Sequence, residues 1–285
     1  MAIQSATKKT MNEYLNNIYY IPMNQRDYTW ETDQLEDFWQ DLLSVKNNQG
    51  RQHFFGQIVV YEDNKNNEKK KYIIDGQQRT VTSMIFLRAI QYLSGELVKE
   101  TDVADEKKGL ESLNHSLEEP LGRTDNCYDS SSHLHLTFEN EISENDFYSK
   151  HIIAEAPSSV KMKDQPACEN MRIAYWYFVK KLKSEINTFI MDEKIRTLYD
   201  FRNALLKKFE VMYLETNDLG ESYVIFETLN ARGKDLETAD LLKNYVFSQA
   251  REKLYDVQSK WRKMTDSLSG LDLTKYTQTS QLLNR

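Results

Sequence analysis

Apolar side chains recur along the chain with two different periods, and each period predicts one type of secondary structure. Residues 33–46 carry five apolar side chains on one helical face: Leu35, Phe38, Trp39, Leu42 and Leu43. Asp33 and Glu36 stand where an acidic variant of a capping box would begin this helix. Residues 53–63 (HFFGQIVVYED) and 71–76 (KYIIDG) are rich in β-branched and aromatic residues, so they predict two strands. The lysine-rich segment between them predicts a solvated hairpin loop, with a basic phosphate patch as the alternative.

The pattern changes to helical spacing after residue 76 and then loses its regularity. Five apolar residues mark the face of a second helix: Val81, Met84, Ile85, Ala89 and Tyr92. Residues 96–132 are polar and poorly periodic, so we expect a variable connection there. Residues 133–138 and 209–215 predict further strands, in a region where helical spacing dominates from about residue 168. These patterns predict an α+β fold.

The same patterns suggest how the chain is organised. We expect a core in residues 1–95, the variable connection in 96–132, and a mostly helical region in 133–285 that completes the domain. The sheet should lie within the first ~100 residues, because both periodic strands of the core occur there.

Composition narrows the class of protein. The 285 residues are 40% apolar and 28% charged, with nine Gly and four Pro, which is typical of a helix-rich globular protein. The chain contains no apolar run of about eighteen residues and no signal peptide, and its two cysteines are far apart. We therefore expect a cytoplasmic protein without membrane contact. A net charge of −7 argues against a general nucleic-acid coat, so any DNA contact is local or made by another domain.

Residues 73–80, IIDGQQRT, gather polar groups where the second strand becomes a helix. Gly76 permits a sharp turn, and the following Gln-Gln-Arg-Thr falls in the first helical turn, where backbone N–H groups lack intrahelical acceptors. A helix N-terminus beside an arginine favours an anion, most often phosphate. Asp75 adds a carboxylate, which beside a phosphate holds a metal ion or orients water. A capped helix with a surface arginine is the structural alternative.

Residues 21–30, IPMNQRDYTW, carry a second polar cluster. Pro22 disfavours helix at the residue before it, so Gln25 and Arg26 lie in an extended approach to the first helix. This Gln-Arg pair and the one in IIDGQQRT could converge on one ligand. Tyr28 and Trp30 could stack on a base or belong to the core.

Residues 226–244, FETLNARGKDLETADLLKN, form the third cluster. The pattern predicts a helix that ends near Leu229, a polar turn, and a new helix with Asp240, Lys243 and Asn244 together. An ordinary surface ion pair is the alternative for Asp240 and Lys243.

Four segments in this order resemble one known family: IPMNQRDYTW, FFGQIVV, YIIDGQQRTVTSMIFL and IFETLNARGKDLETADLLKNYVF. They resemble the N-terminal, GmrS-like domain (domain of unknown function 262) of GmrSD-type, modification-dependent (type IV) restriction proteins, roughly over residues 21–247. That domain belongs to the ParB/sulfiredoxin-like superfamily, so the resemblance implies a small mixed sheet with helices. It also implies a phage-defence domain that binds and hydrolyses a nucleoside triphosphate (NTP). In the family, this domain gates DNA cleavage by a His-Asn-His nuclease, which normally follows in the same chain or in a partner subunit.

The resemblance assigns roles to individual residues. Asp75 and Arg79 are the catalytic candidates. Nucleotide contacts are expected from nine residues: Gln25, Arg26, Gly76, Gln77, Gln78, Thr80, Asn230, Arg232 and Gly233. Further candidates are Tyr28, Lys243 and Asn244. The implied cofactor is Mg²⁺, the nucleotide could be GTP, UTP or CTP, and the implied partners are modified phage DNA, the nuclease and a second copy of the chain.

The chain departs from the family pattern at two points. Glu237 stands where family members usually carry Ser or Thr at a helix start, so that helix could begin elsewhere. The five histidines all precede Asn230: His53, His115, His133, His135 and His151. This chain alone is therefore not expected to cut DNA. His133 and His135 alternate on one strand but have no third ligand nearby in sequence, so we assign no metal site.

Two other functional classes compete with an NTP-hydrolysing regulator. A non-hydrolysing, nucleotide-gated DNA-binding switch of the ParB type would have much the same sequence. A sulfiredoxin-like phosphoryl-transfer enzyme would need a cysteine beside its phosphate-binding residues, but Asp75, Gly76, Gln77 and Gln78 occupy those positions. We therefore discount the third class.

Overall fold

The computed structural model describes most of the chain. The described residues are 3–22, 25, 27–48, 50–64, 69–122, 134–139, 142–154, 156–157 and 165–230, with scattered positions between 246 and 264. The chain divides into two compact units, Met1–Asp218 and Leu219–Arg285. The second unit contributes helix α8 (Leu219–Asn230), and each unit is described by itself.

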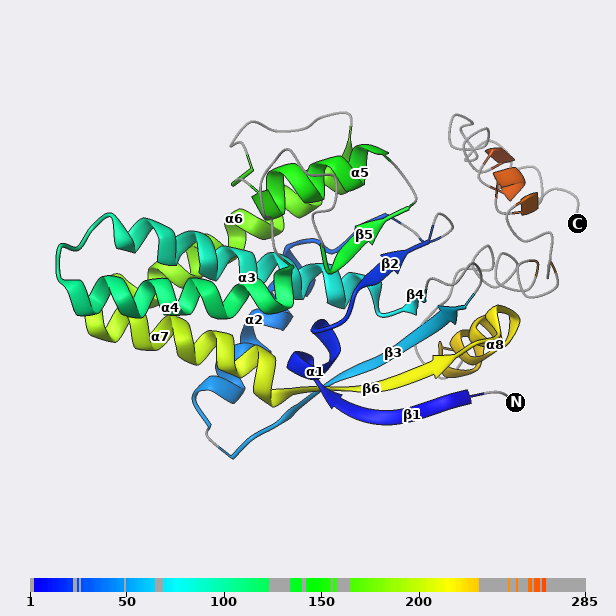
Figure 1. The fold of residues 1–285 in the computed structure, drawn as a ribbon, viewed down its shortest axis with the longest axis horizontal. Helices are drawn as coiled ribbons and strands as arrows, with labels where there is room; N and C mark the ends of the chain where they lie inside the picture. The colour runs from blue at the N-terminus through cyan, green and yellow to red at the C-terminus, as the bar shows by residue number, and fades with distance from the viewer. Residues whose placement is uncertain are drawn as a thin grey trace, which may run out of the picture. The chain divides into compact units, whose positions relative to one another are not determined.

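A six-stranded mixed sheet organises the first unit (Figure 1). Its strands are β1 (Ile3–Thr10), β2 (Tyr19–Ile21), β3 (His53–Asp63), β4 (Lys70–Asp75), β5 (Leu136–Phe138) and β6 (Phe209–Thr216), in the order β1-β6-β3-β4-β2-β5. Strands β3 and β4 pair antiparallel, which confirms the predicted hairpin. Strand β2 is parallel to both β4 and β5, and β3 is parallel to β6.

The sheet draws on more of the chain than the sequence predicted. Strand β6 lies between β1 and β3, so a segment from beyond residue 200 occupies the interior of the sheet. Strand β1, which has no apolar alternation of its own, pairs antiparallel with β6 over its length. The α+β fold class is confirmed, but the expectation that the sheet lies within the first ~100 residues is wrong, because long-range pairing recruits β5 and β6.

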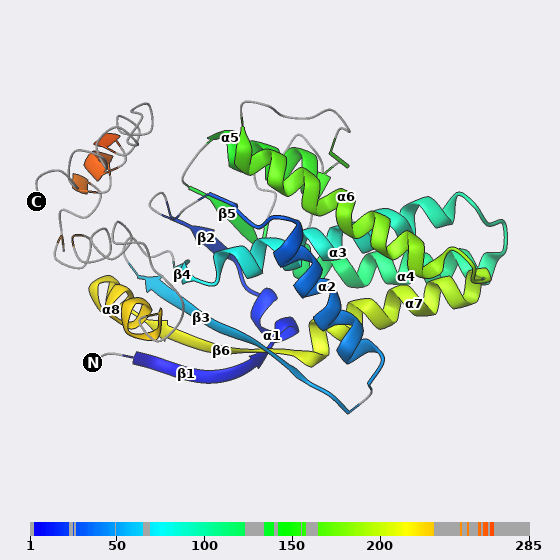
Figure 2. The same cartoon turned by 180° about the vertical axis from the view of Figure 1, so that it is seen from behind.

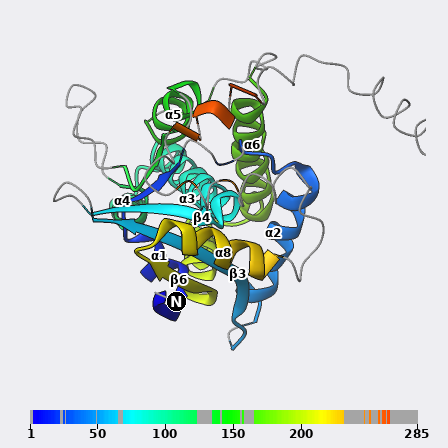
Figure 3. The ribbon, with the colours of Figure 1, turned by 90° about the vertical axis from the view of Figure 1, so that its right-hand side faces the viewer.

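Helices cover the sheet and extend beyond it. They are α1 (Met11–Leu15), α2 (Thr32–Lys46), α3 (Gln77–Val98), α4 (Ala104–Leu121), α5 (Ile142–Phe147), α6 (Pro166–Ile186) and α7 (Met191–Asn203), with π-helical turns η2 (Tyr148–Ala154) and η3 (Ala204–Lys208). Helices α3, α4, α6 and α7 lie side by side at one end of the unit (Figures 1 and 2). Seen along the strands, α3 lies over the sheet with α6 beside it (Figure 3).

Helix α2 begins where the apolar pattern predicts, but with different capping residues. Glu31 is the N-cap, and its backbone N–H donates to Oε1 of Gln34 at 2.9 Å. The predicted capping box at Asp33 and Glu36 is therefore wrong. The apolar face is as expected, since Phe38 packs edge-on against Phe86 on α3 and Phe178 on α6, with ring centroids 5.8 and 5.5 Å apart.

Helix α4 occupies the middle of the stretch for which a variable connection was expected. Leu110, Leu113 and Leu117 recur at i, i+3 and i+7, and all three are fully buried. Gly109 is accommodated inside this helix, and Pro120 lies in its last turn. These two residues hide a short leucine stripe within a polar composition. The expectation of an irregular connection is therefore wrong for Ala104–Leu121.

Among the described residues, no helix is long and apolar enough to cross a membrane.

Candidate functional site

The site forms where β2 and β4 end. Because the two strands are parallel, with Tyr20 paired to Tyr72, their carboxyl ends lie at the same edge of the sheet. The chain leaves β4 through Asp75 into α3, and it leaves β2 toward Gln25. Nε2 of Gln25 donates to the carbonyl of Ile74 at 3.0 Å. The structure thus brings the described part of the first motif against the second, as the sequence predicted.

The turn at Gly76 starts helix α3 in a conformation that requires glycine. Its φ is +98°, in the left-handed region. A Cβ at this position would lie 2.2 Å from Cδ1 of Ile58. No side chain caps the helix through Gly76, and the first turn contains no acidic residue. The helix N-terminus therefore keeps the partial positive charge that favours an anion.

Asp75 and Arg79 face each other across this turn. Oδ2 of Asp75 lies 3.5 Å from Nη2 of Arg79, while Oδ1 accepts the backbone N–H of Gly76 at 2.8 Å. Nη2 also donates to the carbonyl of Gln57 on β3. Nε of Arg79 is buried without a hydrogen-bond partner. Only Nη1 is left to meet a ligand without rearrangement, so the arginine cannot grip a phosphate through two nitrogens in this conformation.

Gln78 binds backbone groups of the first motif. Its side-chain Nε2 donates to the carbonyl of Asp27 at 2.9 Å, and its Oε1 accepts the N–H of Thr29 at 2.9 Å. The side chain is 7% exposed, and the neighbouring Gln77 is also buried. Gln78 was expected to contact the nucleotide, but its amide instead ties residues 27–29 to helix α3.

Thr80 is held by a residue that the sequence did not point to. Its hydroxyl donates to the carbonyl of Gly76 at 2.9 Å and lies 2.9 Å from the hydroxyl of Tyr14 on α1. Because Thr80 has a single hydroxyl proton, Tyr14 is the donor in the second bond. Burial raises the pKa of the Tyr14 phenol, which therefore keeps this proton. Both side chains are fully buried, so the expectation that Thr80 contacts nucleotide is corrected: Thr80 stabilises the turn.

Tyr28 is a core residue. It is fully buried, and its hydroxyl lies 2.8 Å from that of Thr82. Its carbonyl accepts a hydrogen bond from Nδ2 of Asn170 on α6 at 3.2 Å. The hypothesis that Tyr28 stacks on a base is therefore wrong for this conformation. Trp30 packs against the core as expected and is only partly buried.

Several expected site residues cannot be placed against this site. Arg26, Arg232, Gly233, Lys243 and Asn244 lie outside the described residues. Asn230 is the last residue of α8, which agrees with the predicted helix end near Leu229.

The expected metal chemistry has one nearby carboxylate. Within the described ranges, no three His, Cys, Asp or Glu side chains gather closely enough to hold a metal ion by themselves. Nδ1 of His135 lies 3.0 Å from the carbonyl of Leu15, so this histidine has a structural contact, and His133 lies outside the described residues.

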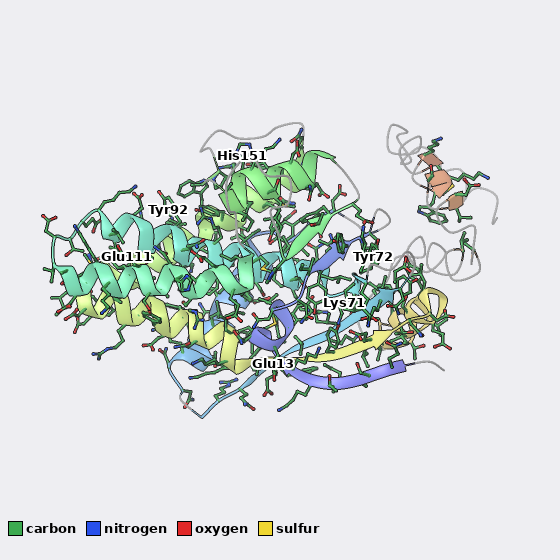
Figure 4. The ribbon with its side chains drawn as sticks, viewed as in Figure 1. Glu13, Lys71, Tyr72, Tyr92, Glu111 and His151 are labelled. Atoms are coloured by element: carbon green, nitrogen blue, oxygen red, sulfur yellow. The ribbon has the colours of Figure 1, made fainter. Side chains whose placement is uncertain are left out.

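A second polar cluster lies on the sheet around Lys71 (Figure 4). Nζ of Lys71 is 2.8 Å from Oε2 of Glu215, which also accepts the hydroxyl of Tyr213 at 2.5 Å. Nζ of Lys9 stands 3.4 Å from the centroid of the Tyr213 ring, a cation–π contact. Burial raises the pKa of the Glu215 carboxyl, but the hydrogen bonds from Lys71 and Tyr213 outweigh this effect and bring the pKa below its ordinary value. This cluster joins β1, β4 and β6.

Comparison with known families adds the decisive observation. Residues 7–247 match the family model described as GmrSD restriction endonuclease, N-terminal domain. The chain belongs to this family. A search of curated proteins gave no match.

The family match covers all four motifs that point to the site. The GmrSD N-terminal domain of this chain therefore includes the whole sheet, the Asp75–Arg79 turn and helix α3. Membership assigns the chain to a restriction system, in which DNA is involved.

Proposed function

We propose that this GmrSD N-terminal domain binds and hydrolyses an NTP and thereby regulates DNA cleavage by an associated His-Asn-His nuclease. The observation that supports the proposal is the convergence of two motifs at the carboxyl ends of parallel strands, around the N-terminus of α3. In open α/β sheets this edge is the usual place for a ligand, and a helix N-terminus favours phosphate.

The residues at the turn divide the work. Backbone N–H groups of the first turn of α3 would bind the phosphates, together with Nη1 of Arg79. Gln78 and Thr80 hold the surrounding backbone, so they act by positioning. Asp75 supplies the only charged acceptor that the structure places directly against Arg79 and Gly76.

The donor set fits a magnesium ion that arrives with its substrate. Mg²⁺ is commonly bound by one or two carboxylates plus substrate phosphates and water, so a single carboxylate at Asp75 is sufficient. When bound, Mg²⁺ would neutralise phosphate charge and lower the pKa of a coordinated water.

The wider role follows from the family. We propose that the domain senses modified phage DNA together with its nuclease, and that nucleotide occupancy controls cleavage. Self-association of the domain would be one way to transmit this state.

One observation favours a second candidate, the non-hydrolysing nucleotide switch. Both oxygens of Asp75 already have partners, Gly76 N–H and Arg79. A carboxylate held in this way is a poor base for activating water, unless a ligand first displaces the arginine.

The direct test measures binding and turnover on the same protein. Titration with GTP, UTP, CTP and ATP, with and without Mg²⁺, is followed by a phosphate-release assay. Binding with magnesium-dependent release supports the NTP-hydrolysing regulator. Binding without release selects the switch, and the absence of any nucleotide binding contradicts both.

A further inference from the structure

Gly56 lies inside a strand but has a backbone conformation that most residues avoid. Its φ is +104°. The pairing of β3 with β6 changes register between Phe54 and Gln57, so the strand bulges at this glycine. The strand does not turn here, since β3 continues to Asp63. A glycine of this kind inside a strand marks a bulge or the close approach of another group.

The approaching group is the guanidinium of Arg79. A Cβ built on Gly56 would lie 3.2 Å from Nη1, 3.3 Å from Cζ and 3.6 Å from Nε of Arg79. These are its three nearest neighbours, so the guanidinium lies directly against the Cα of Gly56. The carbonyl of the next residue, Gln57, accepts the hydrogen bond from Nη2. The bulge therefore offers Arg79 both an open surface and an acceptor.

The bulge also meets the turn from which Arg79 emerges. At Gly76, an added Cβ would lie 2.2 Å from Cδ1 of Ile58 and 3.4 Å from the carbonyl oxygen of Gln57. Residues 56–58 of β3 thus abut the Gly76 turn and the Arg79 side chain together. Two glycines, one on each segment, allow this close approach.

We propose that Gly56 is a positioning residue that seats Arg79 for its nucleotide contact, an inference that rests on the proposed function. Hydrogen bonds alone leave the guanidinium incompletely held, because Nε is buried without a partner. Contact with Gly56 on one side, and Gln57 and Asp75 at Nη2, fix the direction in which Nη1 points. A methyl group at position 56 would push the guanidinium out of this seat.

The alternative is that Gly56 serves only the bulge and that Arg79 merely passes by. A double-mutant cycle on the complete chain separates the two. The variants are Gly56→Ala, Arg79→Ala and the double variant. Gly50→Ala is the matched control, because nothing lies within 4 Å of a Cβ at this exposed glycine.

The first arm of the test is chemical denaturation without nucleotide. Gly56→Ala should lower the unfolding midpoint in both backgrounds, because the positive φ is strained whatever side chain stands at 79. In the Arg79→Ala background the loss should shrink to about half, since the steric conflict is gone. Equal losses in the two backgrounds would overturn the proposal.

The second arm measures nucleotide affinity, which a purely structural role would not couple to Arg79. Gly56→Ala should weaken the affinity about tenfold when Arg79 is present and less than about twofold when it is replaced. Additive losses would assign Gly56 to the sheet alone. If the unmodified protein binds no nucleotide, the proposed function fails, while the denaturation arm still decides whether Gly56 seats Arg79.

Gly56→Ala could also fail to give folded protein. The yield of the double variant then decides the matter. Recovery of soluble, folded protein on adding Arg79→Ala supports the seat, whereas failure of both variants shows that the backbone alone requires glycine and overturns the proposal.

Discussion

The backbone N–H of Thr29 donates a hydrogen bond to Oε1 of Gln78 at 2.9 Å, although the two residues are 49 positions apart. The same amide donates through Nε2 to the carbonyl of Asp27. One side chain therefore satisfies two backbone groups and fixes the segment that follows the first motif. A polar residue that could have faced a ligand is instead part of the framework around the site.

Gln78→Glu should loosen this segment. A carboxylate can accept from Thr29 but cannot donate to Asp27, and it would place a buried negative charge against a carbonyl oxygen. We expect a loss of about 1–3 kcal/mol in the free energy of unfolding and faster hydrogen exchange at the Thr29 amide. Urea denaturation and exchange measured by mass spectrometry check this. Gln52→Glu, at an exposed position, is the control and should leave both unchanged.

Arg79→Ala should weaken nucleotide binding. A single charge-assisted hydrogen bond from Nη1 is worth roughly 1.5–3 kcal/mol, which corresponds to about a 10- to 150-fold loss of affinity. The variant should also be less stable, because the carbonyl of Gln57 loses its donor. Titration with nucleotide measures the effect. The exposed Arg196→Ala on α7 is the control, and an Arg79→Ala affinity equal to that of the control would remove Arg79 from the site.

Much of the fold is predictable from local pattern. The limits of β3 and β6 follow the alternation and β-branched content of residues 53–63 and 209–215. The convergence of the first two motifs could be predicted in outline, because each follows a strand. Its geometry depends on β2 being parallel to β4, which is a long-range pairing that no local pattern reveals.

The details of the site could not be predicted, because residue type does not determine hydrogen-bond partner. Gln78 and Thr80 have the chemistry of ligand contacts, yet buried backbone groups compete for the same donors and acceptors. Tyr14 was missed because it lies 66 residues from Thr80 and outside every motif. Gly56 did carry a signal, since an isolated glycine within a strand pattern indicates a bulge or close approach.

Leu113→Ala tests the unexpected helix α4. The side chain is fully buried between helices, so its truncation should cost roughly 2–5 kcal/mol through lost burial and a cavity. A residue in an irregular solvated connection would cost almost nothing. Chemical denaturation provides the measurement, with the exposed Lys108→Ala on the same helix as control. Equal stability of the two variants would contradict the packing of α4.

Glu215→Gln should reveal a pH-dependent contribution from the cluster around Lys71. The carboxyl has a pKa below its ordinary value of 4.5 in the folded protein, so the unfolded chain binds more protons as the pH falls. Its stabilising effect is therefore fully present above about pH 4.5 and is lost progressively below it. At pH 7 the variant should be less stable by about 1 kcal/mol, since both charged groups are partly exposed.

The same comparison at low pH provides the decisive part of that test. The difference between wild type and Glu215→Gln should shrink as the pH falls from 4.5 toward 2. Glu111→Gln, at an exposed position on α4 (Figure 4), should show no such dependence. A difference that stays constant with pH would mean that Glu215 acts through packing rather than charge.

Asp75→Asn separates binding from chemistry at the turn. The Asn side-chain oxygen can still accept the N–H of Gly76, so the turn should persist. The negative charge beside Arg79 disappears, which frees the guanidinium and removes repulsion toward phosphate. Nucleotide affinity should therefore stay the same or increase, while phosphate release with Mg²⁺ falls by a factor on the order of 10²–10⁴, the usual contribution of a group that positions or activates water. Asp102→Asn, at a fully exposed position, is the control for both assays. Hydrolysis at the wild-type rate in Asp75→Asn would show that Asp75 only stabilises the turn.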